Sequence, residues 1–392
     1  MAFKPVEGKA VAVIGGGISG VVAAHTLSAQ HEVVLFDFSS RGLGGRCGHR
    51  EDPKEGLRFD HGAQFLSVGA TDSEQWKELI SSWLSEGLVE LWTPRLREVT
   101  AGLAPSIKAL DGNSTSFFDV ASAMELYVSP GGMRNLCEGI AGKGRFQSVR
   151  GCRVRRLSRE ANGDWMLYGN PGNVAHHEAS EADAQAADDQ YLGSFKALIL
   201  TDVMLSFPEW HRASLLGLEA HVPELVGVLR ETEMAPLFSL MVSFEPGATE
   251  QADLDAAVIR SCGVLQWICR MTSKTGPSLK QDCWVCVSTR EFAEACLKDE
   301  PMSVEGPKGR IYKPQEKDYL SADPADLMLT SFLDLLQLGA LTPITKQCQR
   351  WGAAYVHRSP RASKFSQGPC LVQASPAIAV CGDFLSAAPA AP

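Results

Sequence analysis

The stretch Lys9-Ala-Val-Ala-Val-Ile14, followed by Gly15-Gly-Gly17-Ile-Ser-Gly20, decides the fold of this chain. Its apolar, β-branched first half predicts a strand that is buried on both faces, and its glycines fit the pattern G-x-G-x-x-G. Residues 21–30 then have a helical composition, and residues 31–36 predict a second strand ending at Asp37. Strand, glycine loop, helix, strand and terminal acid in this order indicate a dinucleotide-binding β-α-β unit.

Each glycine of this loop has a physical role in holding a pyrophosphate. Gly15 permits the tight turn, Gly17 lets the backbone approach the phosphates, and Gly20 allows close packing of helix and strand. Free N–H groups and the positive dipole end of the helix then bind the phosphates. Asp37 is placed to accept hydrogen bonds from the adenosine ribose, which favours FAD or NAD over NADP.

Length and composition limit the remaining possibilities. The 392 residues suffice for two or three domains, and contents of 45% hydrophobic and 21% charged residues are ordinary for a globular protein. A net charge of −9 argues against nucleic-acid partners and anionic membranes. No apolar run approaches the ~20 residues that span a bilayer, and the first strand begins too early for a leader peptide before it. We therefore expect a soluble, intracellular, cytoplasmic protein.

The eleven cysteines are scattered and odd in number, so we expect free thiols in a reducing compartment. Cys283 and Cys286 form a C-x-x-C pair, which can be a redox pair or half of a zinc site. They lie in a strand-like run, where residues i and i+3 point to opposite faces, so we interpret them as buried structural thiols. His176 and His177 have no partner at metal-ligand spacing, and no metal site is predicted.

Two further motifs carry a resemblance to a known family. Arg41-Gly-Leu-Gly-Gly-Arg46 follows the β-α-β unit, and Phe59-Asp-His-Gly-Ala-Gln-Phe65 comes shortly afterwards. Together with the glycine loop, these motifs resemble the flavin amine oxidase superfamily. The second motif resembles its renalase-like branch in particular, as does the later segment Tyr127 to Leu136.

This resemblance implies roles for particular residues. The loop containing Gly45 would lie along the FAD pyrophosphate, with Arg46 in contact with the cofactor, while Gln64 and Phe65 would approach the flavin. The strand that holds Val154 would offer its backbone to the adenine. The full set of expected cofactor-binding residues is Gly15, Gly17, Ser19, Gly20, Asp37, Gly45, Arg46, Gln64, Phe65, Val154 and Asp383.

A second region has a different pattern, with alternating strands at residues 238–244, 264–271 and 283–289 that predict a mostly antiparallel sheet. In the superfamily such a sheet covers the flavin, which makes Trp267 and Trp284 candidates to face a substrate. Aromatic residues in such strands more often belong to the core, and that interpretation is favoured for both.

The predicted fold class is therefore α/β, with two domains. A Rossmann-type FAD-binding domain with a parallel sheet would comprise residues 1–70, 125–204 and 345–392. An α+β substrate domain with a mostly antiparallel sheet would comprise residues 71–124 and 205–344. Residues 173–190 are of low complexity and predict a mobile loop within a hairpin.

The sequence departs from the family pattern in two places. Leu200-Thr-Asp-Val203 stands where relatives have A-T-P. After Gly382-Asp383, relatives continue with a glycine-containing helix that faces the pyrophosphate, whereas residues 384–392 contain two prolines and no glycine. From this ending we expect either a truncated chain or a protein that retains FAD weakly.

The resemblance implies an FAD-dependent oxidase that takes a hydride from a small reduced substrate and passes the electrons to dioxygen. Renalase-like enzymes are described as oxidising misreduced isomers of NAD(P)H, so a dihydronicotinamide is the first candidate substrate. Such a substrate needs no proton-transfer side chain, and none is predicted. Two alternatives stay open: an amine or porphyrinogen-type flavin oxidase, and a flavin-fold protein without turnover.

Overall fold

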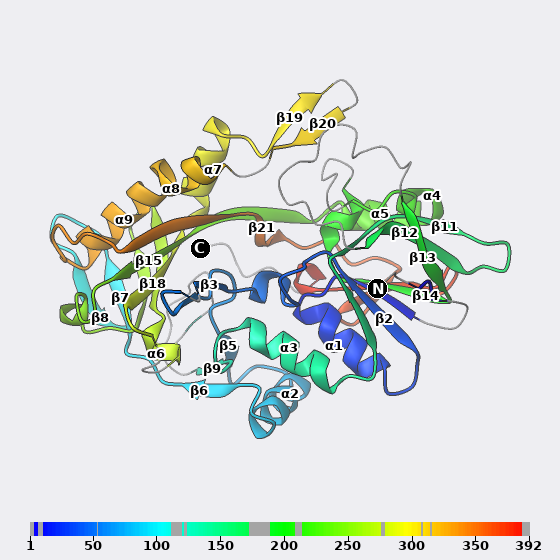
Figure 1. The fold of residues 1–392 in the computed structure, drawn as a ribbon, viewed down its shortest axis with the longest axis horizontal. Helices are drawn as coiled ribbons and strands as arrows, with labels where there is room; N and C mark the ends of the chain where they lie inside the picture. Colours follow the sequence, from blue (N-terminus) through cyan, green and yellow to red (C-terminus); the bar gives the residue numbers. More distant parts are fainter. Residues whose placement is uncertain are drawn as a thin grey trace.

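The computed structural model of the 392-residue chain has two large β-sheets at opposite ends of the molecule (Figure 1). It describes residues 4–6, 11–52, 54–110, 120, 124–171, 189–207, 214–275, 279–306, 309–313 and 316–385. The loop predicted at residues 173–190, with its two histidines, lies almost wholly outside these ranges, as do residues 386–392.

The first seven-stranded sheet is organised around the glycine loop. In spatial order its strands are β10 (Gln147–Arg150), β2 (Val33–Asp37), β1 (Val11–Ile14), β14 (Ala197–Leu200), β24 (Ile378–Cys381), β23 (Cys370–Gln373) and β22 (Ser366–Gln367). The strands from β10 to β24 are parallel, and β23 and β22 pair antiparallel at one edge. Helix α1 (Ile18–Leu27) starts directly after Gly17, three residues before the predicted start. The predicted β-α-β unit and the α/β fold class are confirmed.

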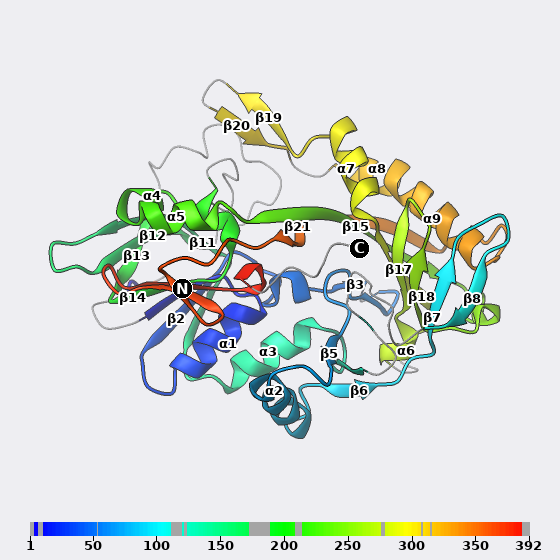
Figure 2. The ribbon, with the colours of Figure 1, turned by 180° about the vertical axis from the view of Figure 1, so that it is seen from behind.

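Side chains of the parallel sheet alternate between two cores. Val13 and Leu35 pack toward α1 and α3 (Arg134–Lys143), which lie side by side on one face (Figure 2). Ala12 and Phe36 point the other way, toward a three-stranded antiparallel sheet. That sheet consists of β11 (Cys152–Arg159), β12 (Trp165–Pro171) and β13 (Gln190–Phe195). Because both faces are covered, the strands can be apolar throughout, as the sequence of β1 and β2 requires.

The second seven-stranded sheet forms the other end of the molecule. In spatial order its strands are β21 (Thr345–Arg358), β15 (Glu233–Phe244), β18 (Asp282–Ser288), β17 (Leu265–Arg270), β16 (Ala256–Arg260), β7 (Leu96–Thr100) and β8 (Ser106–Ala109). All neighbouring strands pair antiparallel except β16 and β7. Cys283 packs on one face of this sheet and Cys286 on the other, so the predicted separation of these two buried thiols is confirmed.

The long strands β15 and β21 run from the second sheet toward the parallel sheet in both views (Figures 1 and 2). They pair antiparallel from Glu233 to Ser243. The domain division predicted from the sequence assigns residues 345–358 to the FAD-binding domain, but these residues form β21 of the second sheet. The division itself stays a prediction.

The remaining elements connect the two sheets or cover them. Helix α9 (Asp323–Leu335) packs on the outer face of the second sheet through Phe332. The other helices are α2 (Glu74–Ser85), α4 (Leu218–His221), α5 (Pro223–Leu229), α6 (Thr272–Thr275), α7 (Arg290–Asp299) and α8 (Lys317–Ser321). The small sheets contain β3 (Arg50–Asp52) with β4 (Leu57–Phe59), β5 (Leu66–Val68) with β9 (Glu125–Val128) and β6 (Glu90–Trp92), and β19 (Ser303–Gly306) with β20 (Gly309–Tyr312).

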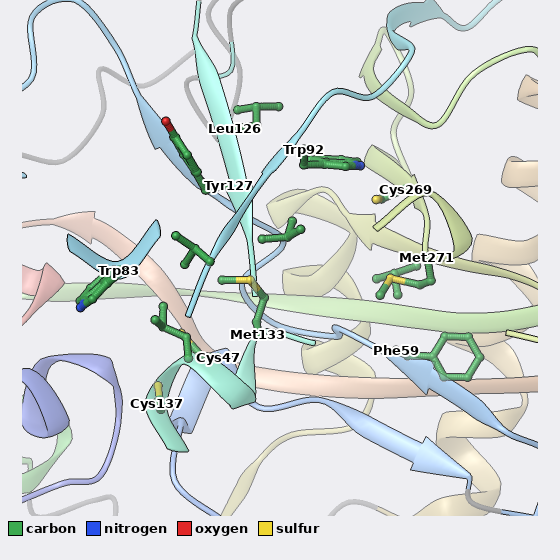
Figure 3. Packing of buried hydrophobic residues seen from close by; sticks show 14 of the residues in the cluster. Cys47, Phe59, Trp83, Trp92, Leu126, Tyr127, Met133, Cys137, Cys269 and Met271 are labelled. Carbon is green, nitrogen blue, oxygen red and sulfur yellow. The ribbon is translucent and has the colours of Figure 1, made fainter. Parts of the chain in front are cut away.

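One apolar core joins the two halves of the molecule. It contains side chains of α3 and of the second sheet, and Figure 3 shows Cys47 and Met133 beside Cys137, with Trp92 near Cys269 and Met271. Cys137 and Cys47 are free thiols, and the hydrogen bond between them lowers the pKa of Cys47. Among the helices described by the structure, none is long and apolar enough to cross a membrane.

Candidate functional site

Two cavities meet at the glycine loop. The first, of about 460 Å³, is called the Asp37 lobe here and is lined by Gly15, Gly16, Asp37, Val154, Asp202 and Met204, among others. The second, of about 330 Å³, is called the Gln64 lobe and is lined by Ser19, His61, Gln64, Phe65, Leu237 and Val287, among others. Gly17, Arg46, Thr201 and Trp351 line both lobes. Ligand sites typically have volumes of about 300–1,000 Å³, so the two lobes together suit a dinucleotide.

Gly17 keeps the passage between the lobes open. A Cβ built on this residue would meet its nearest atom, the Gly44 carbonyl oxygen, only at 4.0 Å, so a side chain would extend into the cavity. Gly17 is also the N-cap of α1 and provides no capping side chain. The first bond of the helix runs from the Val21 N–H to the Gly17 oxygen, which leaves the N–H groups of the first turn, including that of Ser19, for an anion.

Two other glycines are required by close contacts within the loop. A Cβ on Gly20 would lie 1.8 Å from the Gly15 carbonyl oxygen, as expected for tight packing of helix on strand. A Cβ on Gly16 would lie 2.0 Å from Oδ2 of Asp37. Gly16 is not among the expected cofactor-binding residues, although the run of three glycines was a signal that the middle one is also constrained.

Asp37 ends β2 as predicted, and its carboxyl is buried at the wall of the Asp37 lobe. Its Oδ1 accepts a hydrogen bond of 2.8 Å from the Ser39 N–H. Burial raises the pKa of Asp37 to about 6, because the charged form is poorly solvated there. Hydroxyl groups of a bound ribose would donate to this carboxylate and stabilise its ionised form. Val154 lines the same lobe, where the pairing of β11 with β12 shifts register.

The Gly44-Gly45-Arg46 loop lies directly against the glycine loop. The Gly44 N–H donates to the Gly16 oxygen at 2.8 Å, and a Cβ on Gly45 would lie 3.3 Å from the Gly17 Cα. Gly45 has φ +53°, a left-handed conformation that favours glycine. The loop is therefore part of the cavity wall.

Arg46 differs from the expectation in its partner. Both terminal nitrogens of its guanidinium bond to the Asp383 carboxylate at 2.6 Å, and Nη1 also reaches the Ala354 oxygen at 3.2 Å. The guanidinium that was expected to contact the cofactor is thus engaged by a carboxylate, because the turn that begins at Asp383 lies beside the loop. Arg46 still lines both lobes, and a phosphate could approach it from the cavity side.

Asp202 is a second carboxylate near the same guanidinium. It comes from Leu200-Thr-Asp-Val203, the first departure from the family pattern, and it lines the Asp37 lobe. Its carboxylate caps a short turn by accepting from the Met204 N–H at 2.9 Å. Burial raises the pKa of Asp202, Arg46 lowers it, and Asp383 raises it again. An anionic ligand in this lobe would therefore meet an acidic neighbour as well as Arg46.

The side chain of Gln64 is turned into the protein. Its amide nitrogen donates to the Asp60 and Gly62 carbonyl oxygens, and its oxygen accepts from the Lys274 ammonium at 3.3 Å. Lys274 also donates to the Gln64 carbonyl oxygen at 2.5 Å and lies 3.6 Å from the buried Asp60 carboxylate. Gln64 thus fixes the shape of its loop, and Lys274 is a supporting residue that the sequence analysis missed. Its distance of 210 positions from Gln64 left no sequence signal.

The two tryptophan candidates lie on opposite faces of the second sheet. The Trp267 ring is 5.6 Å from the Phe65 ring of the Gln64 lobe, and the Trp92 ring is 6.0 Å from the same ring. Trp284 instead packs 5.2 Å from the Phe332 ring of α9 and donates to Oγ1 of Thr249. Trp284 is therefore a core residue and not substrate-facing. Trp267 is fully buried behind Phe65.

His61 and Trp351 also line the Gln64 lobe, and the sequence analysis gave neither a role. The Trp351 indole donates to the His61 carbonyl oxygen at 2.9 Å, and the two rings are 5.2 Å apart. Burial lowers the pKa of His61 to about 3, so its imidazole is neutral. No described residue bonds to its Nδ1. A signal was present for His61, because it lies inside the motif of residues 59–65.

Within the described part of the chain, His, Cys, Asp and Glu side chains form no group of three that could hold a metal. Asp383 begins a short turn, Asp383–Leu385, and lines the Gln64 lobe. The predicted lack of a helix after this turn concerns residues outside the described ranges. All other expected cofactor-binding residues line one or both lobes, except Gly20, which supports the loop from behind.

Comparison with known proteins agrees with this architecture. Residues 13–83 match a family model described as an NAD(P)-binding Rossmann-like domain. The whole chain is similar in structure to putrescine oxidase bound to putrescine, with a TM-score of 0.63, 13% identity and coverage of 98% of this chain and 95% of that one. It is similar to a putative protoporphyrinogen oxidase from Exiguobacterium sp. 255-15, with a TM-score of 0.59, 13% identity and coverage of 99% and 98%.

A third similar structure is an oxidoreductase from Methanosarcina mazei, with a TM-score of 0.58, 13% identity and coverage of 96% and 94%. At this level of identity the likeness concerns the fold, and it extends over nearly the full length of each chain. The protein therefore has a Rossmann-like amino-terminal region within the overall fold that these oxidases share.

Proposed function

We propose that the protein is an FAD-dependent oxidoreductase that oxidises a small reduced substrate, with dioxygen as the final electron acceptor. The observation that carries this proposal is the two-lobed cavity. It runs from the Asp37 carboxyl past the open Gly17 passage to the aromatic wall at Phe65. A molecule with a ribose at one end, a pyrophosphate in the middle and a flat ring at the other end matches this order of groups.

The residues present fit such a cofactor. Asp37 would hold the ribose hydroxyls, and the first-turn N–H groups of α1 with Arg46 would hold the pyrophosphate. The Gln64 lobe would hold the isoalloxazine. When bound, FAD would supply the redox chemistry, since a flavin can accept a hydride from a substrate and pass the electrons to dioxygen.

The chain's own contribution is to position the substrate and exclude water. Leu237, Val287 and the Phe65 ring give the Gln64 lobe apolar walls. The neutral His61 is the one imidazole among the described residues of this lobe, and its depressed pKa makes it a poor proton acceptor. A dihydro-aromatic substrate suits this wall, because it releases a hydride without needing a base. We therefore favour a dihydronicotinamide-type substrate, as in the renalase-like branch.

An amine or a porphyrinogen is the second candidate. It is supported by the names of two similar structures, putrescine oxidase and a putative protoporphyrinogen oxidase. The identity of 13% to each shows a shared fold, so these names carry less weight than the chemistry of the cavity.

The test is to purify the protein, record its absorbance spectrum and identify the extracted cofactor by mass. We expect bound FAD, and bleaching of its absorbance when dihydronicotinamide isomers are added without oxygen. Bleaching by primary amines alone would favour the second candidate. A protein that takes up no flavin even from excess FAD would contradict the proposal.

A further inference from the structure

A third cavity, of about 670 Å³, lies between the β3–β4 hairpin and strands β15 and β21. It is called the basic cavity here, and its charged lining is mainly cationic, with Arg41, Arg50, Arg134 and Lys346. Leu57, Phe59 and Met241 contribute an apolar part. This concentration of positive charge contrasts with the net charge of −9 of the whole chain.

Two arginines of this cavity are held by neutral oxygens. The Arg50 guanidinium donates to the side-chain oxygens of Gln347 at 3.2 Å and Gln349 at 2.6 Å. Its Nε is buried and has no partner among the described residues. Arg134 donates to the carbonyl oxygens of Arg41 and His49. These contacts fix the two guanidinium groups without neutralising either charge.

The carboxylates nearby are largely engaged elsewhere. Glu51 bonds to His49 and Arg58, each at 2.9 Å. Asp52 accepts from the backbone N–H groups of Lys54 and Glu55, so its carboxylate is turned toward its own hairpin. Lys346 pairs with Asp326 outside the cavity. Four cationic side chains line the cavity against the carboxylates of Glu51 and Asp52, which leaves a positive excess.

This excess has an energetic cost that a bound anion would relieve. Burial lowers the pKa of Arg50, and the neighbouring charge of Arg41 lowers it further. Like charges in a partly buried site repel each other more strongly than they do in water. An arginine group shared by several donors is also the arrangement that best matches a phosphate, which accepts parallel charge-assisted bonds.

The basic cavity and the Gln64 lobe are lined by neighbouring residues of the same three chain segments. On β15, Leu237 and Ser239 line the lobe and Met241 lines the basic cavity. Residues two apart in a strand share a face, so these side chains lie in one row. On β21, Trp351 lines the lobe and Gln347 lines the basic cavity, directly across from Leu237 and Met241.

The third segment runs from Leu57 and Phe59 of β4 in the basic cavity to residues 61–65 in the lobe. On β15, Leu237 of the lobe and Met241 of the basic cavity are four residues apart, which corresponds to about 13 Å along the strand. A ribose with one or two phosphates can bridge this distance. The electrostatics agree with this proximity, because the charges of Arg50 and Arg134 add to burial in lowering the pKa of His61.

We propose that the basic cavity binds the phosphate of a phosphorylated substrate whose reduced ring lies in the Gln64 lobe. The proposal rests on the proposed function and deepens it, since it selects a nucleotide-type substrate. The positive excess of the basic cavity would repel a polyamine, whereas it attracts phosphate. The site is separate from the one offered to the cofactor's own pyrophosphate at Gly17 and Arg46.

The first arm of the test measures binding without turnover. Inorganic pyrophosphate is titrated by calorimetry into the FAD-saturated protein at low salt, so that the cofactor site is filled. We expect a dissociation constant that rises at least tenfold in Arg50→Gln and in Arg41→Gln. The matched control is Arg361→Gln, which removes one exposed charge paired with Glu231 and should leave binding unchanged.

Arg41 is exposed, and its guanidinium has no hydrogen bond to a described residue, so Arg41→Gln should fold even if Arg50→Gln does not. If pyrophosphate does not bind the wild-type protein, the proposal is wrong. Equal losses in the Arg361→Gln control, or no loss in Arg41→Gln, would also overturn it.

The second arm compares a dihydronicotinamide mononucleotide with the riboside that lacks the phosphate. The wild-type protein should prefer the mononucleotide in kcat/KM, and this preference should fall at least tenfold in Arg41→Gln. If neither compound is oxidised, the proposed function fails, while the pyrophosphate titration still decides whether the basic cavity is an anion site. Oxidation of both with equal kcat/KM would contradict the phosphate role alone.

Discussion

The two lobes of the central cavity differ in how the chain builds them. The Asp37 lobe takes much of its wall from the β-α-β unit, where residues 14–17 and 36–39 are brought together by one short helix. The Gln64 lobe is assembled from segments as distant as Ser19, Phe65, Leu237 and Tyr355. A cavity wall made by a local motif can be recognised in sequence, whereas a wall assembled by long-range packing becomes visible only in the folded chain.

The lobes also differ in charge. The Asp37 lobe contains Asp37 and Asp202, while apolar side chains such as Phe65 and Leu237 dominate the far wall of the Gln64 lobe. Arg46 stands where the lobes meet and pairs with Asp383. The polar end is thus suited to fixing a ribose and phosphates, and the apolar end to excluding water from a ring. The predictions below test this division, starting with the largest effect.

Two glycines that look equivalent in the motif should fail in different ways. Gly17→Val places a branched side chain in the passage between the lobes, where no protein atom is within 4 Å except the Gly44 oxygen at 4.0 Å. We expect a folded protein that has lost FAD binding by more than about a hundredfold. Gly20→Val would collide with the Gly15 oxygen, which is 1.8 Å from the site of its Cβ, and should lower the melting temperature instead. Absorbance and thermal unfolding distinguish the two.

If Gly17→Val keeps full flavin occupancy, the passage is not the cofactor path. If both variants lose only stability, the glycine loop has a structural role alone.

The Gln64 lobe should depend on Lys274. This ammonium and the Asp60 carboxylate are each 1% exposed, and Lys274 also supports the Gln64 backbone. Lys274→Met would leave a buried carboxylate without its cation, which typically costs about 3–5 kcal/mol of the free energy of unfolding. Urea unfolding should show this loss, and adding Asp60→Asn should recover part of it. Equal stability of Lys274→Met and wild type would remove Lys274 from the support of the lobe.

The contrast between local and long-range structure also explains what the sequence could predict. The glycine loop, Asp37 and the opposite facing of Cys283 and Cys286 follow from spacing within one or two elements. The facing of Trp284 does not. Trp284 pairs across the sheet with Arg270, which is three residues from Trp267, so the two tryptophans lie on opposite faces. This register between β17 and β18 is set by the folded sheet and not by either strand alone.

The charge clusters likewise could not be predicted from the sequence. Asp202 was visible as a departure from a family pattern, but its meaning comes from Arg46 and Asp383 beside it in space. Arg50 and Gln347 of the basic cavity are separated by 297 positions. Nothing in either local stretch indicates that they meet, because Arg50 lies on β3 and Gln347 on β21, and these strands come together only in the folded chain.

Arg46 lines both lobes, and its loss should weaken the binding of FAD. Arg46→Ala removes a cation from the pyrophosphate position and also takes away the positive charge beside Asp383 and Asp202, two carboxylates next to an anionic ligand. We expect the dissociation constant of FAD to rise about ten- to a hundredfold. Arg46→Lys should retain part of the affinity, since it keeps the charge but loses the fork. Fluorescence titration with FAD measures both, and unchanged affinity in Arg46→Ala would mean that its role is confined to Asp383.

The affinity for FAD should depend on pH through the Asp37 lobe and not through the Gln64 lobe. Burial raises the pKa of Asp37 from 3.8 to about 6 in the free protein. Ribose hydroxyls favour the ionised carboxylate, so below pH 6 binding must release a proton, and affinity should fall by up to about tenfold per pH unit. Above pH 6 affinity should be constant. Asp37→Asn should bind FAD more weakly and with no such dependence on pH. If the FAD affinity of the wild-type protein is the same at pH 5 and pH 7, Asp37 is not the residue that holds the ribose.

Asp202→Asn should have the smallest effect and the opposite sign. The amide oxygen can still accept from the Met204 N–H, so the turn is preserved while one negative charge leaves the lobe. We expect FAD to bind a few-fold more tightly, in the range of about 1 kcal/mol for a partly screened charge pair. The gain should shrink at high salt. Weaker binding in Asp202→Asn would show that the carboxylate contacts the ligand as an acceptor.

A crystal structure of the protein soaked with FAD tests the central claim most directly. The account predicts the adenosine ribose within hydrogen-bond distance of the Asp37 carboxylate, the pyrophosphate at the N-terminus of α1 beside Gly17, and the isoalloxazine in the Gln64 lobe next to Phe65. Density for FAD in the reverse orientation, or in another cavity with both lobes empty, would contradict it.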